Sequence, residues 1–308
     1  MFLINKLIGL SSRLGKKIDF FGKVTHRLKR KKRNMIFDVI ENNSNKLDFS
    51  TFVSDSKIIK KNNCIWIFWY QGVETAPDLI KNCINSIRSN SGSRELIILD
   101  KNNISEYCIL PDYIYDKLNK NIITFTHFSD ILRSFLLSFH GGVWIDATIF
   151  LTKSLDDIIS SGKFFTLKGN KNNSVSEGKW TGYFISSEER FYIFEQMFCF
   201  FISYWENSHK LIDYFLIDYF LKYFYKNDSE FHGLIENLPI NGNDRFLLDH
   251  ISAKELNIID NKKIAYSLGV FKLSYKKQYS HKINTYSSKI MNGNLIDYLN
   301  GECSNESQ

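Results

Sequence analysis

The sequence predicts an α/β fold with a sheet flanked by helices, followed by a helical second half rich in aromatic residues. Short apolar runs alternate with segments of helical periodicity between residues 59 and 156, which is typical of a parallel sheet. Residues 188–224 contain fourteen Phe, Tyr and Trp side chains. With 308 residues, 44% hydrophobic, the chain is long enough for one large domain or for one domain with a subdomain.

The first half divides into strands and helices in alternation. Gly141 and Gly142 separate the last helix from the last strand. Since ligands bind at the carboxyl ends of parallel strands, we expect a site at that edge of the sheet. The predicted strands are 64–70, 95–100, 122–125 and 143–151, and the predicted helices are 76–90, 111–120 and 130–140.

The aromatic stretch at 188–224 predicts two amphipathic helices, because acids and amides interrupt it. Such helices form core packed on the sheet, or alternatively a surface that enters lipid or grips a lipid-linked acceptor. Beyond residue 227 we expect a loop at 239–244 and strands near 264–274.

The basic character of the chain is concentrated at its N-terminus. The whole chain has a net charge of +7, but residues 1–34 contain eleven Lys or Arg and one acid. Apolar residues at helical spacing over 1–21, followed by the run Arg27 to Arg33, predict an interfacial helix on an anionic membrane surface. A solvated basic leader is the plain alternative. Nucleic-acid binding ranks last, because no DNA-binding motif follows.

Cysteine usage and hydropathy predict a cytoplasmic protein, and the basic N-terminal segment predicts its peripheral attachment to the inner face of the cell membrane. The five cysteines are scattered and odd in number, which favours free thiols in a reducing compartment. No run of eighteen apolar residues and no signal-peptide pattern occurs in the sequence.

Asp130 and Arg133 are the first pair of residues that suggests chemistry. They are three residues apart on the first turn of a predicted helix, so their side chains share one face beside the end of a strand. Such a pair suits sugar hydroxyls and a phosphate, which the forked guanidinium binds well. Alternatively, Ser129 caps this helix and Arg133 only neutralises Asp130.

Asp146 is the second candidate, because it is the only charged residue of the apolar segment 143–151. A carboxylate there requires a partner or a cation. Oxygen ligands suit Mg²⁺ or Mn²⁺, which would neutralise a departing nucleoside diphosphate. Alternatively, Asp146 pairs with an arginine or with backbone amides.

Three segments in order resemble the capsular polysaccharide synthesis glycosyltransferases. They are Ile65 to Gly72 followed by Ala76-Pro77, then Phe128 to Arg133, then Gly141 to Thr148. These enzymes are related to the DXD-containing sugar transferases that include the yeast initiating mannosyltransferase and the clostridial glucosylating toxins. The resemblance covers about a third of the chain, from residue 60 to 156.

The resemblance implies a GT-A-type nucleotide-sugar-binding sheet at 59–300, with a donor-binding half at 59–156 and an acceptor-side half at 157–300. Residues 1–58 would form the basic segment and linker. Trp69 would stack on the nucleotide base, although a tryptophan of a buried strand is commonly core. Asp130 and Arg133 would hold the donor sugar and phosphate, and Asp146 would be the first acid of the DXD motif.

The third position of that motif is Thr148 where the wider group has the acid that is its main metal ligand. Asp146 would therefore bind the divalent metal, Mn²⁺ or Mg²⁺, directly or through water, or contact the ribose. A further ligand would come from the C-terminal half, where the candidates are Asp244, His250 and His281. Lys272 and Lys276 belong to a basic segment that returns to the diphosphate or forms a solvated strand edge.

The resemblance implies transfer of a sugar from a nucleotide-sugar donor to a bacterial capsular or O-antigen (lipopolysaccharide) acceptor that is lipid-linked. We expect retention of configuration at the anomeric carbon. The alternatives are a toxin-like protein glycosyltransferase, a non-catalytic membrane-associated subunit of a polysaccharide assembly complex, and a sugar-phosphate transferase.

Overall fold

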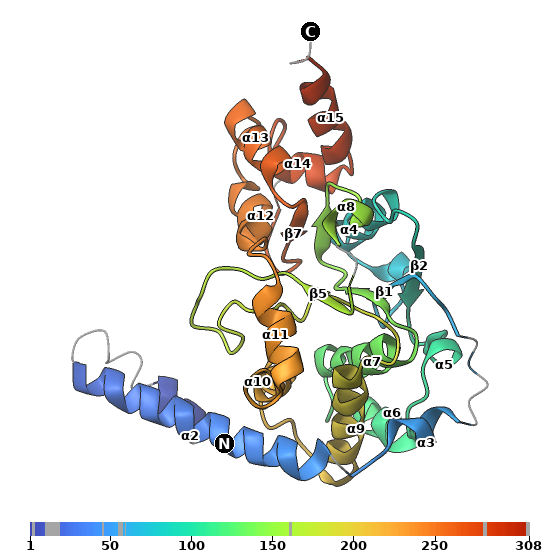
Figure 1. Cartoon of the computed structure of the whole chain (residues 1–308). Helices are drawn as coiled ribbons and strands as arrows, with labels where there is room; N and C mark the ends of the chain where they lie inside the picture. The colour runs from blue at the N-terminus through green and yellow to red at the C-terminus, as the bar shows by residue number, and fades with distance from the viewer. Residues whose placement is uncertain are drawn as a thin grey trace. The chain divides into compact units, whose positions relative to one another are not determined.

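The computed structural model describes residues 1, 4–9, 19–44, 46–54, 58, 60–159, 162–279 and 282–305 (Figure 1). The chain divides into two compact units, each made of three segments. The helical unit comprises Met1–Ser56, Ile109–Ser134 and Tyr192–Gly233, and the sheet unit comprises Lys57–Cys108, Phe135–Phe191 and Leu234–Gln308. The predicted division into a donor-binding and an acceptor-side half stays a prediction.

The described elements of the helical unit are all helices. The unit boundaries at Ser134 and Gly233 fall within α7 and α11. The helices are α2 (Asp19–Ser44), α3 (Phe49–Val53), α6 (Asp112–Asn119), α7 (Phe125–Phe139), α9 (Tyr192–Asn207), α10 (Leu216–Asn227) and α11 (Ser229–Asn237).

Helix α9 forms the core of the helical unit. It packs against α2, α3, α6 and α10. The rings of Phe49 and Phe52 lie perpendicular to the ring of Phe198 at centroid distances of 5.7 and 5.4 Å. Eleven of its sixteen residues are buried, so the prediction that the aromatic stretch forms two helices with core residues is confirmed. The main contacts of α9 and α10 are with other helices, not with the sheet as predicted. The N-terminal helix expected at 1–21 lies largely outside the described residues.

All described strands belong to the sheet unit. Its main sheet has the order β2-β1-β3-β6-β5, and a second sheet pairs β4 with β7. The strands are β1 (Cys64–Phe68), β2 (Glu95–Leu99), β3 (Gly142–Ile145), β4 (Ile149–Leu151), β5 (Phe164–Thr166), β6 (Phe184–Ser187) and β7 (Val270–Lys272). Its helices are η1 (Val73–Thr75), α4 (Asp78–Ser89), α5 (Ile104–Tyr107), α8 (Leu155–Ile158), η2 (Asn243–Phe246), α12 (Leu247–Ile251), α13 (Ile258–Tyr266), α14 (Tyr286–Met291) and α15 (Leu295–Asn305).

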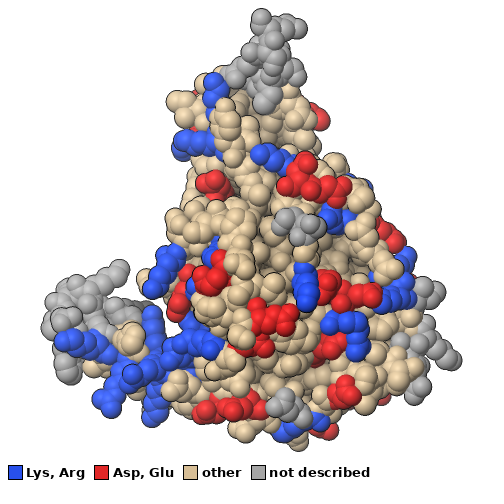
Figure 2. Space-filling model, in the orientation of Figure 1, with Lys and Arg blue, Asp and Glu red and all other residues tan. Residues whose placement is uncertain are grey.

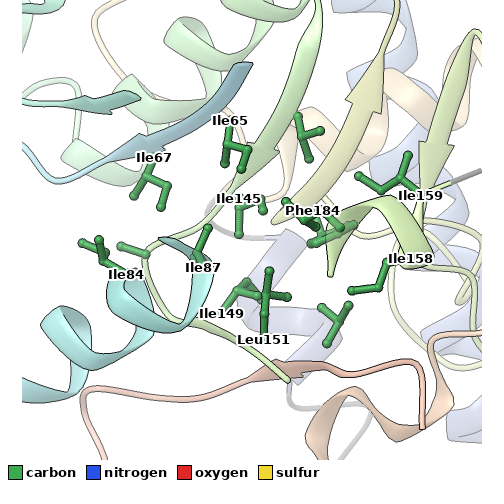
Figure 3. Packing of buried hydrophobic residues seen from close by; sticks show 14 of the residues in the cluster. Ile65, Ile67, Ile84, Ile87, Ile145, Ile149, Leu151, Ile158, Ile159 and Phe184 are labelled. Atoms are coloured by element: carbon green, nitrogen blue, oxygen red, sulfur yellow. The ribbon is translucent and has the colours of Figure 1, made fainter. Parts of the chain in front are cut away.

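The main sheet is mixed. Strand β1 runs parallel to both β2 and β3, whereas β6 runs antiparallel to β3 and to β5. Figure 3 shows the aliphatic core of the unit, where Ile65 and Ile67 of β1 lie close to Ile84 and Ile87 of α4. Burying each such side chain contributes about 1.5–3 kcal/mol. The predicted α/β class, with a sheet flanked by helices, is confirmed.

The paired glycines at the start of β3 are required by neighbouring backbone, because β1 approaches Gly142 and the segment after β6 approaches Gly141. Gly142 has a φ of 91°, and a Cβ atom there would lie 2.4 Å from the carbonyl oxygen of Cys64. Gly141 also has a positive φ, and its carbonyl accepts a hydrogen bond of 2.9 Å from the indole of Trp66. Only glycine fits this backbone geometry without strain.

Several predicted boundaries are wrong. No strand forms at 122–125, because the backbone N–H groups of Ile122 and Ile123 donate to the carbonyl of Lys117 and so fold the chain back onto the end of α6. Helix α7 therefore begins at Phe125, not at Asp130, which lies beyond its first turn.

The predicted strand at 143–151 is two strands, β3 and β4, which belong to different sheets. A turn at 146–148 separates them. Of the strands expected near 264–274, only β7 forms, because 258–266 is helix α13, whose first turn is capped by the side chain of Asn257. The four cysteines with described side chains are free, as expected (Cys64, Cys83, Cys108 and Cys199).

Candidate functional site

The carboxyl ends of three parallel strands bring candidate residues to one edge of the main sheet. Trp69 follows β1, Asp100 follows β2 and Asp146 follows β3. The register pairs Phe68 with Leu99 and Trp66 with Trp144. One or two residues further along, the chains leave the sheet at the same edge, which is where ligands bind in sheets of this kind.

The turn at 146–148 is fixed by backbone hydrogen bonds. The N–H of Asp146 donates to the carbonyl of Tyr183, and the N–H of Leu273 donates to the carbonyl of Thr148, both at 2.9 Å. The β4–β7 pairing places Lys272 opposite Ile149. The short second sheet therefore delivers Lys272 to the side chains of the turn.

Asp146, Thr148, Tyr183 and Lys272 form what we call the Asp146 cluster. The Lys272 Nζ lies 3.1 Å from Oδ2 of Asp146 and donates to Oγ1 of Thr148. It also lies 4.8 Å from the centroid of the Tyr183 ring, within the range of a cation–π contact. The Asp146 and Lys272 side chains are 32% and 22% exposed, so this ion pair is accessible to a ligand.

Trp144 orients the carboxylate of the cluster. Its indole Nε1 donates a hydrogen bond of 3.0 Å to Oδ1 of Asp146. The two carboxylate oxygens of Asp146 are thus directed to different donors, the indole and the ammonium of Lys272. The expectation that Asp146 needs a charged partner is met by a lysine.

The candidate metal ligands do not form a three-residue cluster among the described residues. Among them, no three His, Cys, Asp or Glu side chains gather closely enough to hold a metal ion. Asp244 lies on η2 and His250 on α12, while His281 lies outside the described residues. The Lys272 ammonium contacts both Asp146 and Thr148, where a cation bridging the two side chains would lie. The predicted Mn²⁺ or Mg²⁺ stays untested, but this cluster does not fit it.

Trp69 and Trp66 have different environments. Trp66 is fully buried. Trp69 is half-buried, packs one side on the core, and meets the ring of Tyr275 edge-on at 5.8 Å and 87°. Tyr275 is 49% exposed. This aromatic pair offers a surface on which a planar base can stack.

Asp130 and Arg133 form a buried network within the helical unit. Oδ1 of Asp130 lies 3.3 Å from Nη1 of Arg133, and Oδ2 lies 3.4 Å from Nδ1 of His127. The indole of Trp205 donates to Nε2 of His127 at 2.8 Å. Since an indole N–H only donates, Nε2 presents its lone pair and the imidazole proton of the neutral ring lies on Nδ1, facing Asp130.

The sequence-predicted residues therefore belong to two groups. Asp130 and Arg133 are brought together in the helical unit, and Asp146 and Thr148 are brought together in the sheet unit. Sequence reasoning weighed Lys272 but gave no role to Tyr183, His127 or Asp100. Asp100 had a usable signal, because it is an acid directly after a buried strand. Tyr183 had none, since its loop shows no pattern.

A protein-family model described as capsular polysaccharide synthesis protein matches residues 17–290 of this chain. A solved structure of the PaToxG glycosyltransferase covers 89% of this chain and 97% of its own, but with 14% identity and a TM-score of 0.38 the likeness is too low to support an inference.

Three curated relatives match shorter stretches of the chain. O-glycosyltransferase braB of Annulohypoxylon truncatum is 29% identical over 103 residues, covering 30% of this chain and 24% of that protein. Glycosyltransferase afumC of Aspergillus fumigatus is 30% identical over 101 residues, covering 30% and 26%. An uncharacterized glycosyltransferase of Acanthamoeba polyphaga mimivirus is 29% identical over 123 residues, covering 36% and 44%. The chain thus spans between 24% and 44% of the length of these relatives. Because the family model spans most of the sequence, the chain belongs to the capsular polysaccharide synthesis protein family.

Proposed function

We propose that this protein is a glycosyltransferase that moves a sugar from a nucleotide-sugar donor to the acceptor glycan of a surface polysaccharide. The family and the glycosyltransferase names of its relatives support the reaction class. The observation that carries the proposal is the partly exposed Asp146 cluster at the carboxyl edge of parallel strands. The aromatic surface at Trp69 lies at the same edge of the sheet. On this proposal the sheet unit is a GT-A-type donor-binding sheet.

The residues at this edge suit the parts of such a donor. The indole of Trp69 would stack on the nucleotide base, with Tyr275 bordering the same surface. The carboxylate of Asp146 would accept hydrogen bonds from hydroxyl groups of the ribose or of the sugar. Positive charge near the departing diphosphate would stabilise the transition state, which is the largest contribution that a preorganised site can make.

Asp130 and Arg133 remain candidates for holding the donor sugar and phosphate. Their side chains already pair with each other and with His127, and both residues are buried. To bind the donor, the network would have to direct one of its polar atoms to the ligand while keeping the contacts among Asp130, Arg133 and His127. The alternative role is to hold α7 against Trp205 of α9 through His127.

We propose a lipid-linked acceptor at the cytoplasmic face of a membrane, with α2 as the attachment surface. Figure 2 shows Lys and Arg side chains gathered over α2. The exposed members are Lys23, Arg27, Lys29, Arg30 and Lys31, and such residues attract anionic lipids at about 1 kcal/mol each. Helix α2 is held by packing of its C-terminal half, where Ile36 and Ile40 are buried. Among the described helices, none has the length and apolarity to cross a membrane.

A charge reversal tests the attachment surface. Lys29, Arg30 and Lys31 are replaced together by Glu, and sedimentation with anionic vesicles is compared with that of the wild type at low and high salt. We expect the wild type to pellet at low salt and the variant to stay in the supernatant. Equal pelleting of both proteins would remove α2 as the surface.

A panel of nucleotide sugars tests the function itself. Purified protein is incubated with each donor, and release of the nucleoside diphosphate is measured with and without candidate acceptors. Turnover of one donor would support the transferase. Release of a nucleoside monophosphate would indicate sugar-phosphate transfer, and neither turnover nor binding of any donor would favour a non-catalytic subunit.

A further inference from the structure

We propose that the ammonium group of Lys272 takes the place of a divalent metal, so that donor turnover does not depend on a metal ion. This inference rests on the proposed glycosyltransferase function and deepens it. The Nζ atom of Lys272 contacts the first and the third side chain of the Asp146-Ala147-Thr148 turn. A metal bridging these side chains would have to occupy the same space.

Lys272 is held in this position from several sides. Its backbone is fixed by the pairing of β7 with β4. Its ammonium lies over the ring of Tyr183, whose own backbone carbonyl accepts the N–H of Asp146. The cation therefore needs little rearrangement when a donor binds, which is the property that makes an electrostatic group effective in a transition state.

The ammonium of Lys272 has enough N–H groups to bind a phosphate oxygen as well. A lysine ammonium has three N–H groups, and two are directed to Asp146 and Thr148. With 22% of its side chain exposed, Lys272 can direct the third to an oxygen of the diphosphate. Thr148 stands where the metal motif has its second acid. In this arrangement its neutral hydroxyl accepts a hydrogen bond from the ammonium of Lys272, whereas a second carboxylate at this position would hold a divalent ion.

The chemistry requires no proton from Lys272. The bond between the anomeric carbon and the phosphate oxygen breaks, and its electron pair leaves on the nucleoside diphosphate. The acceptor oxygen bonds to the anomeric carbon, and its proton passes to water. Lys272 stays protonated throughout and stabilises the negative charge that gathers on the departing phosphate oxygen.

The first experiment measures nucleoside diphosphate release by the wild type in chelator and with added Mn²⁺ or Mg²⁺, using the donor found in the panel. We expect the rates to agree within about twofold. Calorimetric titration of Mn²⁺ into protein saturated with nucleoside diphosphate gives a second readout, and we expect no binding beyond that of the nucleotide alone.

The second experiment compares Lys272→Met with Lys262→Met. Lys262 is an exposed lysine of helix α13 in the same unit and serves as the matched control. We expect Lys272→Met to lose turnover by about 100- to 1000-fold, the usual effect of removing one preorganised donor, and Lys262→Met to keep the wild-type rate. Thermal unfolding of each variant shows whether the fold is retained.

The outcomes separate the two proposals. Turnover that stops in chelator and returns with metal would overturn the role of Lys272 while the glycosyltransferase function stands, and this result needs no variant that folds. Full turnover by a folded Lys272→Met variant would overturn it as well. No turnover and no donor binding under any condition would overturn the proposed function, and the inference with it.

Discussion

The helical unit and the sheet unit each contain a group of charged side chains, and the two groups differ in exposure. In the helical unit, the side chains of Asp130 and Arg133 are 9% and 5% exposed and are joined to His127 and Trp205. In the sheet unit, the side chains of Asp146 and Lys272 are 32% and 22% exposed. Both groups contain a carboxylate, a cation and a tryptophan N–H.

Burial decides what each group can do. A buried ion pair must satisfy its charges internally, because an uncompensated charge in the interior is costly. A half-exposed pair exchanges partners at small cost, since water screens its charges. We therefore expect substitutions in the network of the helical unit to change stability first, and substitutions in the Asp146 cluster to change activity first.

The largest effect on stability is expected for Asp130→Ala. Removing the carboxylate leaves Arg133 buried without this partner, a change that costs about 3–5 kcal/mol. Urea unfolding measures the difference, with Asp116→Ala, an exposed acid of α6 in the same unit, as the control. If Asp130→Ala keeps its stability and loses turnover, the expected difference between the two groups is wrong, and Asp130 is a donor-binding residue.

A smaller loss is expected for Trp205→Phe. The change keeps most of the ring but removes the indole N–H that donates to His127. Leaving a buried acceptor unsatisfied costs about 1–3 kcal/mol in the free energy of unfolding. Tyr214→Phe, at a side chain that is 63% exposed, should leave stability unchanged. Equal stability of both variants would show that this hydrogen bond does not support the helical unit.

In the sheet unit, Trp69→Ala is expected to weaken donor binding. Stacking of one base on an aromatic ring contributes about 1–3 kcal/mol, so the KM for the donor should rise roughly 5- to 150-fold. Initial-rate kinetics measure the change, and kcat should be less affected. An unchanged KM would show that Trp69 only packs on the core.

The smallest effect concerns a buried histidine of the sheet unit. Nδ1 of His140 accepts the backbone N–H of Lys61, and Nε2 lies 2.9 Å from the carbonyl of Tyr107. Burial lowers the pKa of His140 below its usual value. The unfolded chain therefore binds the proton more readily, and stability should fall as the pH drops below about 6.5. Urea unfolding between pH 5 and pH 8 measures this, and His140→Gln should flatten the slope.

The sequence predicted the α/β class, most elements and the Trp69 and Asp146 positions, because alternation of apolar runs and the Gly141-Gly142 turn are local signals. It did not predict the end of α6, where Asn121 adopts a φ of 56° and the chain turns back. It also did not predict that β7 carries Lys272 to Asp146, since that contact joins residues 126 positions apart. Such a pairing depends on the tertiary fold, and no short pattern encodes it.

The Asp130 and Arg133 pairing was predicted by their spacing, but the burial of the pair was not. Their spacing of three residues gives the contact on any helix. His127 lies on α7 three residues before Asp130, but the hydrogen bond from Trp205 to His127 depends on α9, which lies far along the chain. Burial of the pair could therefore not be derived from the segment around residue 130.

The most direct test of the Asp146 cluster is Asp146→Asn, measured for both donor turnover and the free energy of unfolding. Asparagine keeps an acceptor for the indole of Trp144 but removes the charge that meets Lys272. We expect a loss of turnover of about 100- to 1000-fold with a change in unfolding free energy below about 1 kcal/mol. Wild-type turnover in a folded Asp146→Asn variant would contradict a role of the Asp146 cluster in the reaction.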